Sequence, residues 1–393
     1  MDTTPHTPFI IAGRGLAAVL IANELIAQGT APSDILLCAP PHDPIASHVP
    51  GALMHPLPGS SLKPKPDVML AYDTSLKTLQ AWKQTHPEHV LQTSMLRLDR
   101  GMKRGKRYIK SYTNTHQEYS PELTHTLTPH DALHQEQPAL AKDCTQAVQY
   151  GPTFCVALGS LLPILLEDLI QKGVQQEPSK IESIQRDETQ NTWTIHTEQT
   201  HTLSTTHLIL AVGPTLHQWF PDLPLGVNGG ELLLIKNTPD TTLNRMLSAG
   251  GHISQMPSCA PHTQVLGSSY LRPHDGQEPH TEEAFYRPDS EAVEQVTQMI
   301  GRFFPPALTS PVQKIWRGRR AVYLPDKHPL VGDVPGAQNL YVLGTLGSKG
   351  LLWGPFAAKQ LVTKIMNPHT HTIPMSCSTK RVEHDAWTCT ITQ

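Results

Sequence analysis

The sequence lacks several patterns that would place it in other classes of protein. Its six cysteines, at positions 38, 144, 155, 259, 377 and 389, form no Cys-x-x-Cys pair. This argues against a disulfide framework or a zinc site and indicates a reduced, cytosolic protein. The 22 histidines are scattered through polar stretches without the spacing of metal ligands. We therefore expect surface histidines and no metal.

Long runs of basic charge are also missing, and the formal net charge is −3. This argues against a dedicated nucleic-acid binder, although a local basic patch remains an alternative. The basic cluster Lys103-Arg104-Gly105-Lys106-Arg107 is more typical of a solvated loop or hairpin tip than of a binding site.

The first apolar stretch lacks the features of a signal peptide or a membrane span. Arg14, Asn23 and Glu24 interrupt residues 9–27, and no basic segment precedes them. We expect a buried strand and helix, no membrane association and a cytoplasmic location.

A glycine-rich turn is the most informative feature present. An apolar strand from residue 9 runs into Gly13-Arg14-Gly15-Leu16-Ala17-Ala18, a Gly-x-Gly-x-x-Ala turn that opens a helix to about Gln28. Such a turn suits dinucleotide binding, because glycine allows close approach to a pyrophosphate at the helix N-terminus. Alone it is also compatible with a ligand-free turn, but a second strand at Ile35–Cys38 completes a βαβ unit.

Periodicity and turn residues predict the later elements. Strand and helix patterns at both ends of the chain enclose a middle that resembles an antiparallel sheet, which predicts two interleaved domains. We place the dinucleotide domain at 1–90, 145–220 and 315–393, and the second domain at 91–144 and 221–314. Helices are predicted at 67–85, 129–135, 155–172, 282–303 and 354–365, and strands at 95–99, 107–112, 180–186, 193–197, 207–212, 231–236, 251–255, 264–270 and 339–343.

Four segments in this order resemble the FAD-dependent D-amino-acid oxidase superfamily, which includes glycine oxidase and sarcosine oxidase. The segments are the first glycine turn, Ala46-Ser47 with Gly51-Ala52-Leu53, the strand Leu208–Gly213, and Arg320 through Leu351. The resemblance implies an α/β fold in which a Rossmann-like FAD-binding domain is interleaved with an α+β substrate domain built on an antiparallel sheet. It also implies an enzyme that oxidises a C–N bond.

Within the superfamily, the chain is most similar to the FAD domain of the bifunctional tRNA 5-methylaminomethyl-2-thiouridine biosynthesis proteins. Leu36–Ala39, Gly51–Leu53, Leu346–Leu351 and Pro355 carry this likeness. It implies removal of a carboxymethyl group from a modified wobble uridine of tRNA, with no counterpart of the methyltransferase half. The alternatives are a glycine oxidase-like or D-amino-acid oxidase or dehydrogenase acting on a free small amino acid, and a non-catalytic flavin-binding subunit.

The resemblance also assigns candidate roles to residues. For the substrate carboxylate the candidate is Arg320, with Arg319 as its competitor, and Tyr323, His252 and Tyr270 are candidates for the substrate-domain floor. Lys349, at a helix start, would stabilise negative charge on reduced flavin. The FAD-binding candidates are Gly13, Arg14, Gly15, Leu16, Ala18, Ala39, Ser47, Gly51, Ala52, Ile184, Ala211, Gly213, Gly344, Gly347, Ser348, Lys349, Gly350 and Leu351.

Three departures from the superfamily pattern affect these assignments. The second strand ends at Ala39-Pro40, where an acidic residue usually holds the adenosine ribose, and Asp43 is the nearest carboxylate. The usual Gly-Ala-Ser-x-Asn stretch reads Ile45-Ala46-Ser47-His48-Val49. Arg320 and Asp326 are separated by one residue more than in the superfamily's Arg-Pro-x-Thr-x-Asp pattern. Weaker or altered FAD binding is therefore expected.

Overall fold

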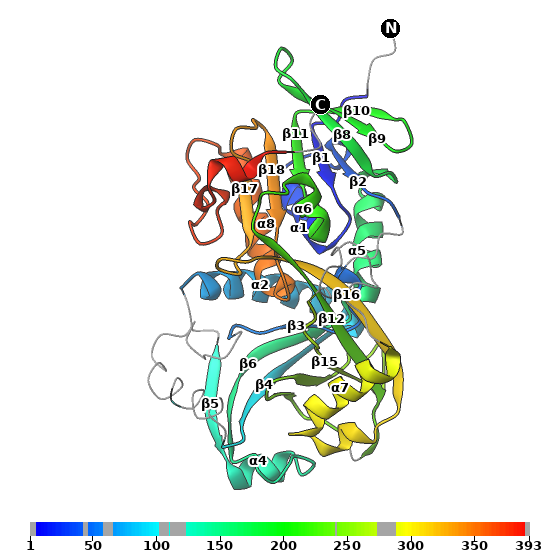
Figure 1. The fold of residues 1–393 in the computed structure, drawn as a ribbon, viewed down its shortest axis with the longest axis vertical. Coiled ribbons are helices and arrows are strands. Elements are labelled where there is room, and N and C mark those ends of the chain that lie inside the picture. The colour runs from blue at the N-terminus through cyan, green and yellow to red at the C-terminus, as the bar shows by residue number, and fades with distance from the viewer. Residues whose placement is uncertain are drawn as a thin grey trace. The chain divides into compact units, whose positions relative to one another are not determined.

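The computed structural model describes residues 5–41, 46–57, 66–101, 110, 123–239, 242–272 and 288–389. These residues form two compact units, which are described separately here (Figure 1). Unit 1 comprises residues 1–48, 162–227 and 319–393, and unit 2 comprises 49–161 and 228–318. No helix within the described ranges has the length and apolar character needed to cross a membrane. The cluster 103–107 lies outside the described residues, and so does the strand predicted at 107–112 except for residue 110.

Unit 1 is built on a six-stranded sheet with the order β17-β18-β11-β1-β2-β7. Five of its strands, β1, β2, β7, β11 and β18, run parallel, and β17 is antiparallel to β18. Because parallel strands end at one edge, the turns that follow β1, β11 and β18 gather there. The bounds are β1 Phe9–Ala12, β2 Ile35–Cys38, β7 Gln175–Glu177, β11 His207–Leu210, β17 Leu330–Asp333 and β18 Leu340–Gly344.

Helices and a small three-stranded sheet surround the unit 1 sheet. The helix α1, Leu16–Ala27, consists of good helix formers and is apolar on most sides, as expected for a helix enclosed by neighbours. It packs against α8, Gly350–Met366. The strands β8 Ile181–Asp187, β9 Thr192–Thr197 and β10 Thr202–Thr205 form an antiparallel ribbon, and the remaining helices are α5 Leu158–Gln171 and α6 Leu216–Trp219.

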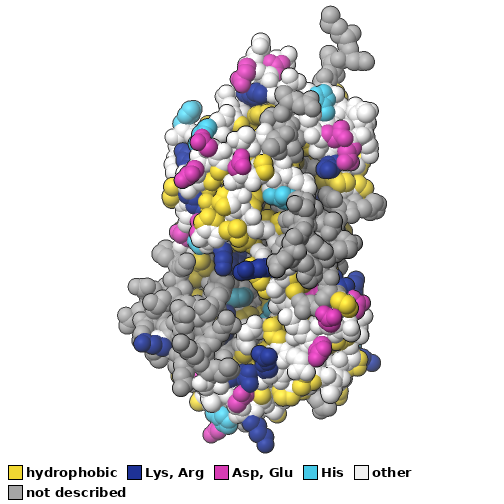
Figure 2. Space-filling view, in the orientation of Figure 1, with side chains coloured by type: hydrophobic (Ala, Val, Ile, Leu, Met, Phe, Trp, Pro, Cys, Tyr) yellow, Lys and Arg dark blue, Asp and Glu magenta, His cyan; other side chains and the backbone are white. Residues whose placement is uncertain are grey.

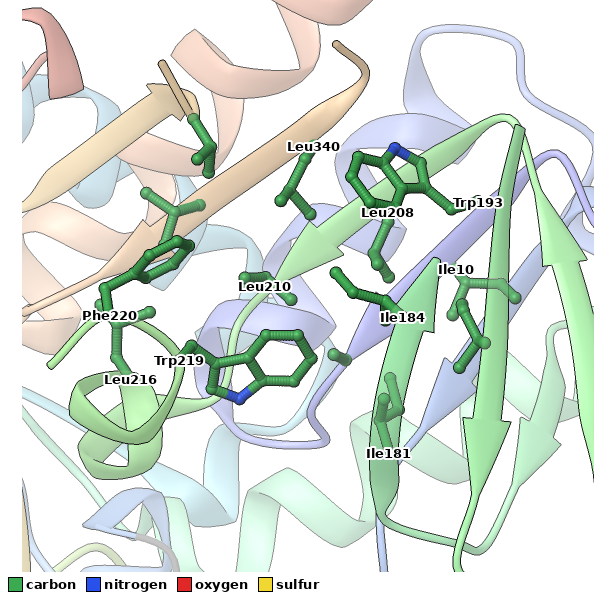
Figure 3. Packing of buried hydrophobic residues seen from close by; sticks show 14 of the residues in the cluster. Ile10, Ile181, Ile184, Trp193, Leu208, Leu210, Leu216, Trp219, Phe220 and Leu340 are labelled. Carbon is green, nitrogen blue, oxygen red and sulfur yellow. The ribbon is translucent and has the colours of Figure 1, made fainter. Parts of the chain in front are cut away.

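The ribbon packs onto the unit 1 sheet through one hydrophobic core. Figure 3 shows Ile184 and Trp193 of the ribbon directed toward Leu208 and Leu210 of β11. Trp219 and Phe220, from the segment that contains α6, complete the same cluster, and Trp387 near the C-terminus joins it. Burial of several large side chains, each contributing about 1.5–3 kcal/mol, makes this core a main source of stability in unit 1.

Unit 2 is built on a mixed sheet with the order β16-β12-β15-β14-β13-β4-β6-β3, and β5 also pairs with β6. Strand pairs β12–β15, β15–β14, β14–β13, β4–β6, β6–β3 and β5–β6 are antiparallel, as expected for this domain, and β13 runs parallel to β4. The bounds are β3 Ala52–Met54, β4 Val90–Asp99, β5 Thr124–Pro129, β6 Gln146–Val156, β12 Leu225–Lys236, β13 Met246–Ser248, β14 His252–Gln255, β15 Thr263–Gly267 and β16 Val312–Tyr323.

One face of the unit 2 sheet is covered by α7, Asp289–Gly301 (Figure 1). Val296 and Ile300 of this helix pack with Leu247, Ile253 and Leu266 of the sheet. The other helices are α2 Pro66–Thr85 and α4 His130–Glu136. Short 3-10 turns occur in the two units at Pro32–Asp34, Ala46–His48, Pro87–His89, Gly213–Thr215, Pro305–Leu308, Thr379–Arg381 and His384–Trp387.

Several predicted boundaries differ from the observed ones. The helix predicted from residue 155 begins at Leu158, because Cys155 and Val156 are the last residues of β6. The helix predicted from residue 354 begins at Gly350 and accommodates Pro355 in its second turn. The first segment of unit 1 ends at residue 48 instead of 90, because β3 and β4 both pair with β6 in the unit 2 sheet.

Candidate cofactor and substrate sites

Gly13 occupies a position in unit 1 that no other residue type fits. Its φ is +133°, and its N–H donates to the carbonyl oxygen of Cys38 at 2.9 Å. A Cβ at this position would lie 2.5 Å from the carbonyl oxygen of Ala211. The turn after β1 is therefore in contact with the ends of both neighbouring strands, and glycine is required for the backbone to pass between them.

Ser47 reaches the N-terminus of α1 from a distant part of the sequence. Its hydroxyl accepts a hydrogen bond from the N–H of Leu16 at 3.0 Å. A Cβ on residue 15 would lie 3.2 Å from the same Oγ, so Gly15 leaves room for this contact. The N-cap residue supplies no capping side chain, and the first turn of α1 carries no acidic residue. No carboxylate in the first turn of α1 therefore neutralises the positive end of the helix dipole.

Replacing Ser47 with alanine is expected to lower the free energy of unfolding by about 1 kcal/mol, the usual cost of losing a helix-capping hydroxyl. FAD affinity should fall about three- to tenfold, since the helix end loses its fixed geometry. Thermal unfolding and a fluorescence titration with FAD measure the two effects. Asp187→Ala is the control, because Asp187 Oδ1 accepts from Thr189 and Gln190 in the β8–β9 turn. It should cost stability and leave FAD affinity unchanged; an unaltered affinity in Ser47→Ala would contradict the assignment.

A second glycine turn follows β18 and begins α8. Gly347 has a φ of +57° and donates its N–H to the carbonyl oxygen of Ala321 at 3.2 Å. Lys349 is the N-cap residue of α8, and its side chain supplies no cap. A Cβ on Gly350 would lie 3.3 Å from Leu16 Cδ2, and one on Gly354 would lie 2.8 Å from Leu20 Cδ1. These small residues bring the N-terminal ends of α8 and α1 together.

The end of β2 carries no carboxylate within the described residues. The N–H of Ala39 donates to the carbonyl oxygen of Glu177 at 3.0 Å. Arg14 Nη1 lies 3.5 Å from the carbonyl oxygen of Pro40. The pKa of His48 is lowered from its ordinary value by burial and by the charge of Arg14. Asp43, the nearest carboxylate in the sequence, lies outside the described residues.

The unit 1 residues fit a dinucleotide cofactor. Two adjacent helix N-termini present backbone N–H groups and positive dipole ends, the arrangement that binds a diphosphate. Gly13 and Gly15 place no side chain between a diphosphate and the N-terminus of α1. Gly213, at φ +58°, follows β11 at the same edge of the sheet. Ala211, Gly344, Ser348 and Leu351 lie in or next to the same turns.

One predicted FAD contact lies in the core of unit 1, and two others belong to unit 2. Ile184 has no exposed surface and packs in the core between the ribbon and the sheet (Figure 3), so we remove it from the cofactor set. Gly51 and Ala52 belong to unit 2. A Cβ on Gly51 would lie 2.8 Å from both Met256 Sδ and Val265 Cγ1, so close packing within unit 2 explains this glycine.

The alternation of β16 separates the two arginine candidates. Val322 Cγ2 lies 3.5 Å from the position of a Cβ on Gly347, and Arg320, two residues earlier, shares that face of the strand. Arg319 shares the opposite face with Tyr323, which is 6 % exposed in the hydrophobic core. The Arg381 guanidinium lies 4.9 Å from the centre of the Tyr323 ring. Burial raises the pKa of Tyr323, and we assign it a packing role instead of a catalytic one.

His252 lies on a polar patch of the unit 2 sheet. The register pairs Ser248 with both Arg97 and His252, so these three residues of β4, β13 and β14 share one face. The Arg97 guanidinium donates to the carbonyl oxygen of Leu57 at 3.0 Å and to the Tyr150 hydroxyl at 3.1 Å. His252 Nε2 is buried without a hydrogen-bond partner in the described part of the chain. Burial, and then the charge of Arg97, lowers the pKa of His252 to about 4.

The lowered pKa of His252 predicts a loss of stability in acid. The unfolded chain takes up this proton below the ordinary value of 6.5, whereas the folded chain takes it up only near pH 4. Stability therefore falls as the pH drops through this range, by about 2 kcal/mol between about pH 7 and pH 4.5. Urea unfolding of the wild type and His252→Gln at both pH values measures the difference. An equal acid loss in the two proteins would show that His252 is not the group concerned.

Two residues of this patch, Arg97 and Tyr150, were absent from the sequence-based predictions. A signal was present, because Arg97 stands between Leu96 and Leu98 in a strand with buried residues on both faces. Such a charge inside an apolar strand requires polar partners. Tyr270, in contrast, is 55 % exposed, and the structure does not bring it into this patch.

The charge distribution and the possible metal ligands bear on other types of site. On the face drawn in Figure 2, Lys and Arg side chains are interspersed with Asp and Glu. Among the residues that the structure describes, no group of three or more His, Cys, Asp or Glu side chains is arranged to hold a metal ion.

The fold and the glycine turns define a dinucleotide-binding protein, and comparison with known proteins identifies the family. The FAD dependent oxidoreductase (DAO) family model matches residues 9–364, and the chain belongs to this family. This confirms the predicted superfamily, the FAD cofactor and the oxidoreductase class.

Similar proteins include a tRNA-modifying enzyme and small-molecule oxidases. The tRNA 5-methylaminomethyl-2-thiouridine biosynthesis bifunctional protein MnmC of Idiomarina loihiensis is 24 % identical over 252 residues, covering 63 % of this chain and 38 % of the relative's length. Glycine oxidase from Geobacillus kaustophilus superposes with a TM-score of 0.78 at 15 % identity, covering 97 % of this chain and 100 % of that chain. Iminodiacetate oxidase from Chelativorans sp. BNC1 has a TM-score of 0.73 at 16 % identity, with 94 % and 99 % covered. The structural likeness confirms the predicted fold class.

Proposed function

We propose that this chain oxidises the C–N bond of an amine that carries a carboxylate, and that its substrate is the carboxymethylaminomethyl group of a modified wobble uridine in tRNA. The observation that supports a tRNA substrate is the similarity to MnmC. A second MnmC, from Acinetobacter baylyi, is 31 % identical over 126 residues. The chain spans only 38 % and 18 % of these two relatives. The proposal concerns the oxidative step alone.

Bound FAD would supply the redox chemistry by accepting a hydride equivalent from the carbon next to the substrate nitrogen. The chain's own residues would bind the cofactor, orient the substrate and neutralise negative charge. Gly13, Gly15 and the N-terminus of α1 would hold the diphosphate. The N-terminus of α8, with Lys349 beside it, would offset negative charge at the pyrimidine end of the cofactor.

Arg320 would hold the substrate carboxylate. Its planar, permanently charged guanidinium can donate two parallel hydrogen bonds to a carboxylate, which fixes the orientation of the attached carbon. The half-buried position of Arg320 on β16, on the face that carries Val322 beside Gly347, supports this role. Oxidation would leave an imine, and water would then release the aminomethyl nucleoside and glyoxylate.

Within unit 2, we propose that His252 acts as a neutral imidazole. With a pKa lowered to about 4, its ring carries no charge at neutral pH, so it would not oppose a substrate amine electrostatically. The proposal gives it a hydrogen-bonding role and requires no general base, because a deprotonated amine can lose hydride without one.

Product analysis tests the substrate. Purified holoprotein is incubated with tRNA that carries the carboxymethylaminomethyl group, the tRNA is digested to nucleosides, and glyoxylate is assayed in the supernatant. We expect equimolar aminomethyl nucleoside and glyoxylate, with neither product from tRNA that lacks the modification. Glyoxylate formed from glycine, with the modified tRNA left intact, would replace the proposal with a free amino-acid oxidase.

A further inference from the structure

The C-terminal segment of unit 1 attaches to its sheet at the edge strand β17. Ser378 forms a parallel bridge with Val331 of β17, and the N–H of Val331 donates to the carbonyl oxygen of Cys377 at 2.9 Å. Thr379 Oγ1 donates to the carbonyl oxygen of Asp333 at 2.7 Å. Val382 is buried in the core of unit 1. The segment therefore extends the edge of the sheet at β17.

Arg381 links this segment to the turn between β16 and β17. Its Nε lies 2.8 Å from Asp326 Oδ2, and its Nη2 donates to the carbonyl oxygen of His328 at 3.2 Å. Its Nη1 donates to the carbonyl oxygen of Ser378 at 2.8 Å, and its guanidinium covers the Tyr323 ring. The Arg381 side chain is only 10 % exposed. Such a buried, multiply bonded arginine fixes the groups around it more firmly than a surface ion pair does.

The carbonyl oxygen of His328 also accepts a bond from Thr345. Thr345 Oγ1 donates to it at 3.2 Å and accepts from the N–H of Leu330 at 2.9 Å. Thr345 has a φ of +56°, a conformation that a β-branched residue rarely adopts. Backbone strain of this kind persists only where surrounding contacts hold it, and it is concentrated at functional sites.

Thr345 is the first residue of the turn that leads to Gly347, Lys349 and α8. These contacts connect the C-terminal segment to the second glycine turn through one shared atom, the carbonyl oxygen of His328. We propose that Arg381 is a positioning residue for the cofactor: by holding this carbonyl, it keeps Thr345 in its strained conformation and the α8 N-terminus in place. The inference rests on the proposed contact between that turn and FAD.

A double-mutant cycle tests the connection. Arg381→Met removes the guanidinium, and Thr345→Val removes the hydroxyl while keeping the branched shape. Each is expected to raise the Kd for FAD about tenfold and to shift the midpoint potential of the bound flavin to a more negative value, because reduced flavin loses stabilisation at the α8 N-terminus. The double variant should bind within about twofold of the weaker single variant, since the two side chains act through one carbonyl.

Arg186→Met is the matched control. Arg186 also lies over an aromatic ring, with its guanidinium carbon 5.4 Å from the centre of Trp193, but it belongs to the β8–β9 ribbon. It should alter thermal stability without changing the Kd or the potential. Should Arg381→Met fail to fold, Arg381→Lys takes its place, because lysine retains the ion pair with Asp326 but lacks the guanidinium fork needed to reach His328 as well.

The outcomes separate this inference from the proposed function. Additive effects in the cycle, or a loss of thermal stability with FAD affinity and potential unchanged, would reduce Arg381 to a structural anchor and overturn the inference. FAD affinity and potential are measured without substrate, so the inference stands or falls independently of which amine the enzyme oxidises.

Discussion

Gly13→Ala is expected to abolish FAD binding and to destabilise unit 1 by at least about 3 kcal/mol. The new Cβ would lie 2.5 Å from the carbonyl oxygen of Ala211, closer than any real contact, and a φ of +133° is unfavourable for alanine. The backbone conformation alone accounts for about 1–3 kcal/mol, and displacement of β11 adds to it. Thermal unfolding of the apoprotein and the flavin content after purification measure the two effects.

Gly29→Ala separates the two causes. Gly29 follows α1 with a φ of +98°, and a Cβ there would meet nothing within 4 Å. This control carries the conformational cost without the clash, so it should lower stability by about 1–2 kcal/mol and retain FAD. Equal losses of stability and of FAD in the two variants would contradict the special role of the turn after β1.

Arg320→Met is expected to lower kcat/KM for the carboxylate-bearing amine about 100-fold or more and to leave FAD content unchanged. Removing one partner of a buried, charge-assisted pair costs about 2–5 kcal/mol, and methionine preserves the length of the side chain. The loss should be much smaller for an amine that lacks the carboxylate, because the variant affects the anchor and not the redox step. Steady-state kinetics with matched substrates measure both.

Arg319→Met is the matched neighbour. Arg319 shares the β16 face that carries the buried Tyr323, whereas Arg320 shares the face of Val322. We therefore expect Arg319→Met to retain carboxylate selectivity. The opposite result, with selectivity lost in Arg319→Met and kept in Arg320→Met, would assign the anchor to Arg319 and would mean that β16 presents the other face to the substrate.

The parts of the site that depend on short segments were predictable from the sequence. The turn at Gly13 and Gly15 and the α1 helix are determined within about twenty residues, and the structure has α1 at Leu16–Ala27 as predicted, to within one residue. The strand Ile35–Cys38 was predicted at its observed bounds. Local backbone requirements of glycine and continuous apolar runs are strong signals at this range.

Features that depend on long-range pairing were not predictable. The assignment of residues 49–90 to unit 2 depends on β6, which lies far along the chain and pairs with both β3 and β4. Ile184 and Tyr323 looked suitable for a ligand site, but strand alternation directs both into the core. The role of His328 as a shared acceptor for Arg381 and Thr345 links positions up to 53 residues apart in the sequence. No local pattern carries that information.

We propose above that the chain uses FAD to oxidise a carboxymethylated amine in tRNA. Anaerobic titration of the flavin absorbance tests it most directly, with additions of glycine, sarcosine, D-amino acids, proline and tRNA carrying the carboxymethylaminomethyl group. We expect a yellow protein that is bleached stoichiometrically by the modified tRNA and not by the same tRNA without the group. Bleaching by a free amino acid while the modified tRNA leaves the flavin oxidised would contradict it, and so would a protein that takes up no FAD.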